Sequence, residues 1–262
     1  MKKSNLSAVV LTSKGDASLE RSLKSVSFCD EIIVVADNPD RKTKELARRY
    51  KAIFFQRSLN GNFAAQRNFA LQKSSGEWIL FVDDDEEISN DLKDEIIRKI
   101  NKENDRKIIA YYIKRRDFWW GRELKFGEVK KVRSKGLIRL VRKNSGRWHG
   151  LVHEVYLPHG SCDRLQAYIN HFPHQSIGEF LKDINYYSSL RAKELLVEGN
   201  SVNLLEIIFF PLAKFLLNYF INMGFRDGEA GFAYAFLMSF HSFLVRAKLY
   251  QYLKLSARHS QA

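Results

Sequence analysis

The stretch WILFVDDDEEIS at residues 78–89 passes from an uninterrupted apolar run directly into five acidic side chains. Residues 78–82 predict a buried β-strand, and Ser89 or Asn90 predicts the start of a helix that ends near Ile100. Apolar runs at 8–11, 32–35 and 52–55 alternate with helical patterns at 19–26, 42–50 and 63–71. This alternation predicts an α/β fold with a parallel sheet flanked by helices, in which ligands bind beyond the carboxyl ends of the strands.

The pattern changes after residue 107 to strand-like runs separated by basic and aromatic loops. The runs lie at 108–113, 137–141, 152–156 and 167–169, and we expect them to extend the same sheet in antiparallel fashion. Ser176 predicts the start of a long helix that ends near Glu198, and residues 204–255 are helical in pattern and rich in aromatic side chains. The sequence therefore predicts a domain at residues 1–175 and a helical C-terminal region at 176–262.

The acidic run has two interpretations. Carboxylates near a helix N-terminus stabilise the helix by about 0.3–1 kcal/mol each, which explains Glu87. Helix stabilisation explains the three aspartates poorly, because two carboxylates about 4 Å apart repel by roughly 4 kcal/mol at an effective dielectric constant near 20. A divalent cation reverses the sign of that energy. Asp83 and Asp85 alternate along the strand end, so they point to the same side, as a shared hard cation and phosphate oxygens require.

Composition narrows the class of protein. The chain has 262 residues, of which 45% are hydrophobic and 28% charged, so disorder and low-complexity architecture are excluded. Two cysteines exclude a disulfide framework and favour a reducing compartment. The opening MKKSNLSAVVLTSKG is interpreted as a first strand rather than a targeting segment. No window predicts a clean transmembrane span, and the nearest, residues 204–221, contains Glu206, Pro211 and Lys214.

Positive charge is concentrated in one internal segment. The formal charge is +13, and residues 102–147 hold 16 Lys and Arg against 5 Asp and Glu, a net charge of +11. This excess predicts a polyanionic partner: nucleic acid, an anionic membrane or a phosphorylated substrate. Trp119, Trp120 and Phe126 lie among these charges, and aromatic faces stack on sugars and bases alike. No recognised nucleic-acid-binding module is present, which favours a glycan over a nucleic acid.

Several segments together resemble one enzyme family. An apolar strand followed by an Asp-x-Asp-Glu run resembles the metal-binding motif of family 2 inverting glycosyltransferases, which have the GT-A nucleotide-sugar-binding fold. SAVVLTSKGDASLERSLKSVSFCDEIIVV resembles the family's opening βαβ unit, FAAQRNFAL its helix with a Gln-Arg-Asn trio, and IRLVRKNSGRWHGLVHEVY its Val-His-Glu segment. INYYSSLRAKELL and KFLLNYFINMGFRDGEAGFAYAFLMSFHSFLVRAKL resemble the lipopolysaccharide inner-core β-1,4-glucosyltransferase subgroup. The resemblance covers nearly the whole chain.

The resemblance implies roles for the acidic run and for the side chains near it. Asp85 would bind Mg²⁺ or Mn²⁺, and Asp83 would contact the ribose or the metal, while Asp84 replaces a small residue and is expected to be exposed. Arg67 and Asn68 would contact the nucleotide, the alternative being an exposed polar helix face. Thr12 would line the nucleotide pocket.

The resemblance fails at one position. Relatives place an Asp directly after the second strand, where it recognises the base, and alignment puts Ala36 there, with Asp37 one residue later. Either the strand ends one residue later and Asp37 substitutes, or base recognition is altered.

An inverting transfer needs a general base within reach of the acceptor hydroxyl. The resemblance favours Glu154 as the base and His153 as a metal ligand or a donor to phosphate. The alternative is a structural strand pair, because neighbouring strand residues point to opposite faces. Asp117 and Glu128 are weaker candidates for the base.

The resulting hypothesis is an inverting, metal-dependent hexosyltransferase. Its donor would be a nucleotide-diphosphate sugar, taken as UDP-glucose, and its acceptor an anionic lipid-linked core glycan, guided by Arg139 and Arg142. The aromatic tail would contact the membrane surface, placing the enzyme in the cytoplasm at the cytoplasmic face of the inner membrane. The alternatives are the same chemistry on another glycan or a polyprenyl phosphate, a basic nucleic-acid-binding protein, and an inactive relative.

Overall fold

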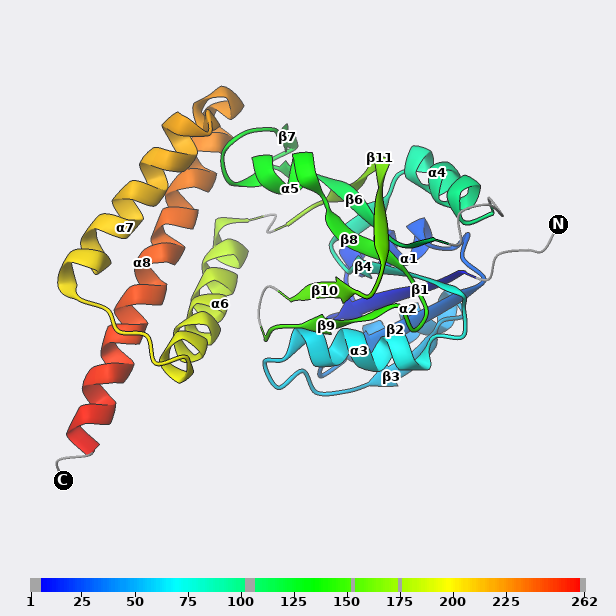
Figure 1. Ribbon diagram of the computed structural model, residues 1–262, viewed down its shortest axis with the longest axis horizontal. Coiled ribbons are helices and arrows are strands. Elements are labelled where there is room, and N and C mark those ends of the chain that lie inside the picture. Colours follow the sequence, from blue (N-terminus) through cyan, green and yellow to red (C-terminus); the bar gives the residue numbers. More distant parts are fainter. Residues whose placement is uncertain (1–5, 102–106, 152–153, 174–175, 260–262) are drawn as a thin grey trace. The chain divides into compact units, whose positions relative to one another are not determined.

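The computed structural model describes residues 6–101, 107–151, 154–173 and 176–259, and the chain divides into two compact units (Figure 1). The first unit comprises Met1–Asp117 and Val132–Phe172, and the second comprises Phe118–Lys131 and Pro173–Ala262. Each unit has hydrophobic clusters of its own.

The first unit is built on a mixed sheet with the strand order β3-β2-β1-β4-β8-β6-β11-β5. β1 to β4 are mutually parallel, which confirms the α/β prediction. These strands are β1 (Leu6–Thr12), β2 (Glu31–Ala36), β3 (Ile53–Gln56) and β4 (Trp78–Asp83). The remaining strands are β5 (Glu86–Ile88), β6 (Ile108–Trp119), β8 (Leu137–Arg142) and β11 (Ser161–His171).

The second half of this sheet differs in part from expectation. β8 is antiparallel to both β4 and β6, as predicted, but β11 is parallel to β6. The predicted strand at 152–156 does not join the sheet either. β9 (Gly146–His149) and β10 (Val155–Pro158) instead form a separate antiparallel hairpin. Its side chains Trp148 and Tyr156 are buried against the face of the sheet that contains Ile79 and Phe81. Residues 152 and 153 lie outside the described residues.

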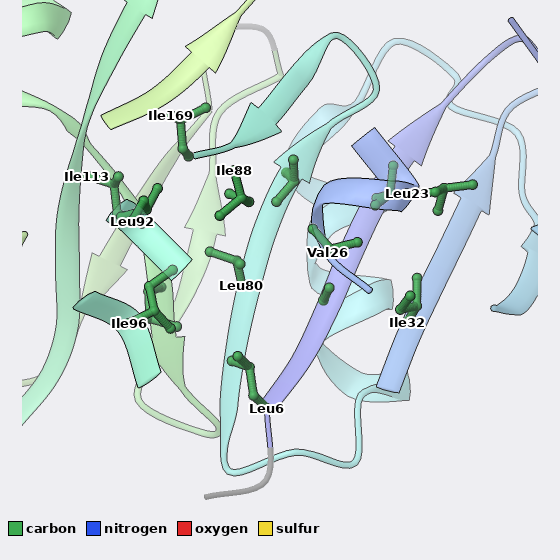
Figure 2. Close-up of a cluster of buried hydrophobic side chains, with 14 of the residues drawn as sticks. Leu6, Leu23, Val26, Ile32, Leu80, Ile88, Leu92, Ile96, Ile113 and Ile169 are labelled. Atoms are coloured by element: carbon green, nitrogen blue, oxygen red, sulfur yellow. The ribbon is translucent and has the colours of Figure 1, made fainter. Parts of the chain in front are cut away.

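Helices cover the sheet on both faces. α1 (Ala17–Ser25), α2 (Arg41–Arg49) and α4 (Asn90–Ile100) pack on one face, and α3 (Phe63–Lys73) packs on the other with the β9–β10 hairpin. Side chains of β4 alternate between the two clusters: Leu80 and Val82 face α1 and α4, while Ile79 and Phe81 face α3. Figure 2 shows Leu80 beside Leu92 and Ile96 of α4.

Capping side chains set where the helices begin. Asp16, Asp40, Asn62 and Ser89 each accept a backbone N–H of the first turn that follows, so Ser89 starts α4, one of the two predicted alternatives. These caps fix the loops that follow β1, β2, β3 and β5.

The second unit is mainly helical, as predicted from the tail. α7 (Leu204–Leu216) and α6 (Ile177–Val197) pack against α8 (Gly228–His259), with the short turns η2 (Leu217–Ile221) and η3 (Gly224–Asp227) between α7 and α8 (Figure 1). The other segment of this unit, Phe118–Lys131, contains β7 (Arg122–Leu124), η1 (Gly127–Val129) and the first residues of α5 (Lys130–Lys135).

Trp119 is part of the core of this second unit. Its side chain is fully buried, and its ring stacks on Trp120 and meets Phe180 and Tyr234 edge-on. Trp119 is therefore closed to a ligand, whereas Trp120 is 46% exposed. Burying a large aromatic ring stabilises the core strongly, so the charged residues beside Trp119 in the sequence do not keep it at the surface.

Candidate functional site

Polar side chains converge where β1 and β4 end. Leu11 lies opposite Asp83 in the parallel pair, so Thr12 and the turn at Asp84 and Asp85 come next to each other. The chain then enters β5, which pairs with the end of β11 and brings His171 opposite Glu86. The sheet topology thus assembles the site from residues far apart in sequence.

Asp83 is held between two buried guanidinium groups. Arg67 Nη2 lies 2.7 Å from Oδ1, and Arg139 Nη2 lies 2.5 Å from Oδ2. Burial opposes ionisation of Asp83, but Arg139 and Arg67 outweigh it and hold its pKa well below the usual range. Arg139 also donates to Glu86 at 2.9 Å, and burial nevertheless raises the pKa of Glu86.

Asp85 is joined to His171. The imidazole Nε2 lies 3.2 Å from Asp85 Oδ2, and Nδ1 lies 2.6 Å from Oδ1 of the fully buried Asp117. Burial and Arg115 lower the pKa of His171, but Asp85 and Asp117 outweigh them and raise it to about 9. His171 is therefore a cation at neutral pH and donates from both nitrogens. Since Asp117 is enclosed by His171 and Arg115, it cannot meet an acceptor hydroxyl, and the weaker prediction of Asp117 as base is wrong.

Asp84 is partly buried rather than simply exposed as expected. The Thr12 hydroxyl donates to Asp84 Oδ2 at 2.6 Å. Burial and the neighbouring Asp85 carboxylate raise the pKa of Asp84 to about 7, against the effect of that hydrogen bond. Such a shift marks a place where negative charge is in excess.

Helix α3 connects the acidic turn to Glu154. Arg67 donates from Nε to Glu154 Oε1 at 2.6 Å and lies over the ring of Trp148 at 4.8 Å, with only 4% of its side chain exposed. The alternative of an exposed polar face is therefore wrong for Arg67. Asn68 exchanges two hydrogen bonds with the backbone of Trp148, at 2.8 and 3.0 Å, so its amide anchors β9, the strand that precedes Glu154.

The second strand ends one residue later than the sequence pattern predicts. β2 includes Ala36, which is fully buried and pairs with Thr12 and Gln56, so Asp37 is the first residue after the strand. Asp37 Oδ1 accepts the Leu59 backbone N–H at 3.2 Å. The strand thus ends one residue later, as the first of the two alternatives requires, and the role of Asp37 in base recognition stays a prediction.

Other predicted site residues lie elsewhere. Glu128 belongs to the second unit, where it binds Lys214 and Asn218. Arg142 pairs with Glu77 and covers Trp78, and Arg139 is buried beside Asp83, so neither prediction of an acceptor-guiding arginine fits well. His153 lies outside the described residues. The roles of His171, Arg115 and Glu86 were not predicted from the sequence, although His171 ends strand β11, a position where polar site residues were expected.

The network carries more negative than positive charge. The network has two more acidic than basic side chains, counting protonated His171 as a cation. The acidic side chains are Asp83, Asp84, Asp85, Glu86, Asp117 and Glu154, and the cations are Arg67, Arg115, Arg139 and His171. Among the described residues no three His, Cys, Asp or Glu side chains form a ready metal cage. Mg²⁺ usually binds through one or two carboxylates together with substrate phosphates, so the donor set of Asp84 and Asp85 fits such an ion.

Comparison with known proteins gives a consistent result. The sequence model for glycosyl transferase family 2 matches residues 7–156. The chain is 29% identical to the lipopolysaccharide core biosynthesis glycosyltransferase LpsC of Rhizobium meliloti, over 97% of this chain and 94% of LpsC. It is 28% identical to an uncharacterized glycosyltransferase of Rickettsia typhi, over 97% and 89% of the two chains.

A solved structure has the same fold. The mannosyltransferase PcManGT from Pyrobaculum calidifontis, determined with GDP-mannose and Mn²⁺, aligns with a TM-score of 0.51 at 14% identity, over 100% of this chain and 77% of that one. This likeness agrees with the GT-A-type fold predicted from the sequence.

Proposed function

Because the chain belongs to glycosyl transferase family 2, we propose that it transfers glucose from UDP-glucose to a hydroxyl of a lipopolysaccharide core glycan, with inversion and with Mg²⁺ or Mn²⁺. That it is a glycosyltransferase follows from the family. The donor, the acceptor, the stereochemistry and the metal are the proposal.

The observation that carries the proposal is the uncompensated charge at the turn after β4. Asp84 is left without a cationic partner among the described residues, and burial together with the neighbouring Asp85 carboxylate raises its pKa. A divalent ion at this turn would be held by Asp85 together with Asp84, and it would stabilise the negative charge of the departing diphosphate. Asp83, whose two oxygens accept from Arg67 and Arg139, would contact the ribose. PcManGT, which shares the fold, was determined with Mn²⁺, which supports the use of such an ion.

The chain's own cations suit a diphosphate. Arg67 Nη1 and Arg139 Nε are buried N–H groups with no hydrogen-bond partner among the described residues, and each is available to an anionic oxygen. Thr12 and Asp37 end neighbouring strands and would line the nucleotide, with Asp37 in the position that contacts the base. Asn68 would act on the nucleotide indirectly, since its amide already holds Trp148.

Glu154 is the proposed base. In a single displacement it would accept the proton of the acceptor hydroxyl while that oxygen attacks the anomeric carbon and the diphosphate leaves. Arg67 holds Glu154 and Asp83 with one guanidinium group, so it fixes the proposed base relative to the proposed donor site. We assign Arg67 a positioning role in addition to any contact with phosphate.

The acceptor is proposed from similarity. LpsC is described as a lipopolysaccharide core glycosyltransferase and aligns over nearly the full length of both chains, which supports a core glycan. The same chemistry on another glycan or a polyprenyl phosphate is the nearest alternative. Arg139 is buried and Arg142 is paired, so these two arginines of the basic segment give little support to nucleic-acid binding.

A donor screen tests the proposal. We would measure nucleoside diphosphate release from the common nucleotide sugars with Mn²⁺, with Mg²⁺ and with EDTA. The proposal expects UDP release from UDP-glucose that stops in EDTA. Release from a different donor would overturn the donor assignment, and full turnover in EDTA, or by an Asp85→Asn variant, would overturn the metal assignment.

A further inference from the structure

The exposed apolar side chains of α7 are the largest feature that the proposed chemistry does not explain. α7 and the turn η2 expose ten large apolar side chains, each between 47% and 69% accessible: Leu204, Leu205, Ile208, Phe209, Phe210, Leu212, Leu216, Leu217, Phe220 and Ile221. Monomeric soluble proteins rarely expose so large a contiguous apolar surface. Something outside this chain is therefore expected to cover it.

The width of this surface indicates what covers it. Within α7 only Ile207 and Pro211 are buried, and Pro211 accepts a hydrogen bond from Ser239 of α8. At 100° per residue, the exposed apolar positions of α7 span an arc of about 240°. A packed partner helix covers a much narrower stripe, whereas hydrocarbon surrounds a helix on every side that the protein leaves free. The arc favours a lipid phase over a second copy of the chain.

The charged groups indicate how the helix lies. Leu204–Ile221 is the one described stretch long and apolar enough to cross a membrane by length and composition, and 17% of it is buried. Lys214 stands near its middle and pairs with Glu128 at 2.7 Å, on the side turned away from the exposed arc. A helix that crossed the bilayer would carry this ion pair into the hydrocarbon centre, which is costly. A helix lying in the plane of the interface keeps Lys214 on its protein side.

Helix α8 extends the same surface. Phe232, Phe236, Phe240 and Phe243 recur at intervals of four, four and three residues and are 37–57% exposed. Phe232 meets Phe215 and Tyr219 of the α7–η2 segment edge-on. The phenylalanine stripe and the α7 arc therefore adjoin.

We propose that α7, η2 and this phenylalanine stripe form a membrane-docking face that inserts into one leaflet of a lipid bilayer. The driving force is burial of apolar side chains in hydrocarbon, so binding resists high salt. This inference does not depend on the identity of the donor or the acceptor.

Vesicle flotation of the full-length protein tests it. The wild type should float with phosphatidylethanolamine–phosphatidylglycerol vesicles, and 1 M NaCl should not release it. A Phe209→Gln, Leu216→Gln, Phe220→Gln variant should partition about 100-fold less or weaker still. A matched variant in the first unit changes the exposed apolar residues Ile53, Val155 and Leu157 to Gln and should float like the wild type.

The remaining outcomes decide against the proposal. A wild type that stays in solution, or one that forms a dimer which the triple α7 variant dissolves, would overturn it in favour of a protein partner. Donor hydrolysis in solution should be the same in the wild type and the triple variant, so a failure of docking is distinguishable from a failure of the proposed function. Fluorescence of a Phe209→Trp variant should be quenched more by lipids brominated near the head groups than by lipids brominated at the chain ends; the reverse order would overturn the in-plane arrangement.

Discussion

The turn after β4 and the exposed arc of α7 both depart from the usual arrangement of polar side chains in water and apolar side chains in the core. The turn buries charged groups, and α7 exposes apolar ones. The turn draws six carboxylates into a partly buried network with four cations, whereas α7 and η2 leave ten large apolar side chains in water. Each arrangement is unfavourable in the isolated chain. In our proposals, a cation and a phosphate-bearing ligand complete the first, and a lipid phase completes the second. Buried charges and exposed apolar side chains thus both indicate the kind of ligand or surface that a chain binds.

The largest expected effect is the loss of sugar transfer when the proposed base of the first region is removed. Glu154→Gln keeps the shape of the side chain and removes the proton acceptor, so transfer to the acceptor should fall by about 10²–10⁴-fold while donor binding persists. Initial rates of transfer and calorimetric donor titration measure the two quantities. The exposed Glu77→Gln serves as control and should leave both unchanged. Undiminished transfer by Glu154→Gln would exclude Glu154 as the base.

The next effect concerns the stability of the carboxylate network. Arg139→Leu leaves Asp83 and Glu86 buried without their shared cation and should lower the free energy of unfolding by about 3–5 kcal/mol. Arg142→Leu, three residues along the same strand, removes a partly exposed pair with Glu77 and should cost about 1 kcal/mol or less. Urea denaturation measures both. Equal losses would mean that the network is not electrostatically held.

These pairings show what the sequence could and could not reveal. The first half of the sheet was predictable, because buried parallel strands and capped helices leave local patterns such as residues 78–82 and Ser89. Arg139 meets Asp83 across 56 residues, and His171 meets Asp85 across 86. No local period encodes such a contact. The acidic turn was visible in the sequence, but the cations that balance it were not.

The same limit explains the errors in sheet topology. β11 and β10 both have strand-like patterns, yet one joins β6 in parallel and the other pairs only with β9. The pattern of a strand reports which of its faces is buried, not which neighbour it binds. Likewise, Trp119 looked like a ligand-binding residue because it stands among charges, whereas packing in the second unit buries it.

A smaller effect follows from the titration of His171. Its pKa is raised to about 9 in the folded state, above the unfolded value near 6.5, so its contribution is complete below pH 6.5 and is lost as the pH rises through 9. In EDTA, stability should fall by at most about 3 kcal/mol across that window. His171→Gln should flatten this slope, and the exposed His149→Gln should not. A slope that survives in His171→Gln would assign it to another group.

The smallest effect is expected where the apolar side chains are most exposed. Leu212 is 55% accessible on α7, so Leu212→Gln should change the free energy of unfolding by about 0.5 kcal/mol or less. Leu237 of α8 is 6% accessible, and Leu237→Ala should cost about 2–5 kcal/mol. Thermal or urea unfolding without lipid compares the two. If Leu212→Gln cost as much as Leu237→Ala, the α7 arc would already be covered in solution by another protein surface. If Leu212→Gln left the free energy of unfolding in water nearly unchanged but weakened vesicle binding, the apolar side chains of α7 would serve contact with lipid and not the stability of the fold.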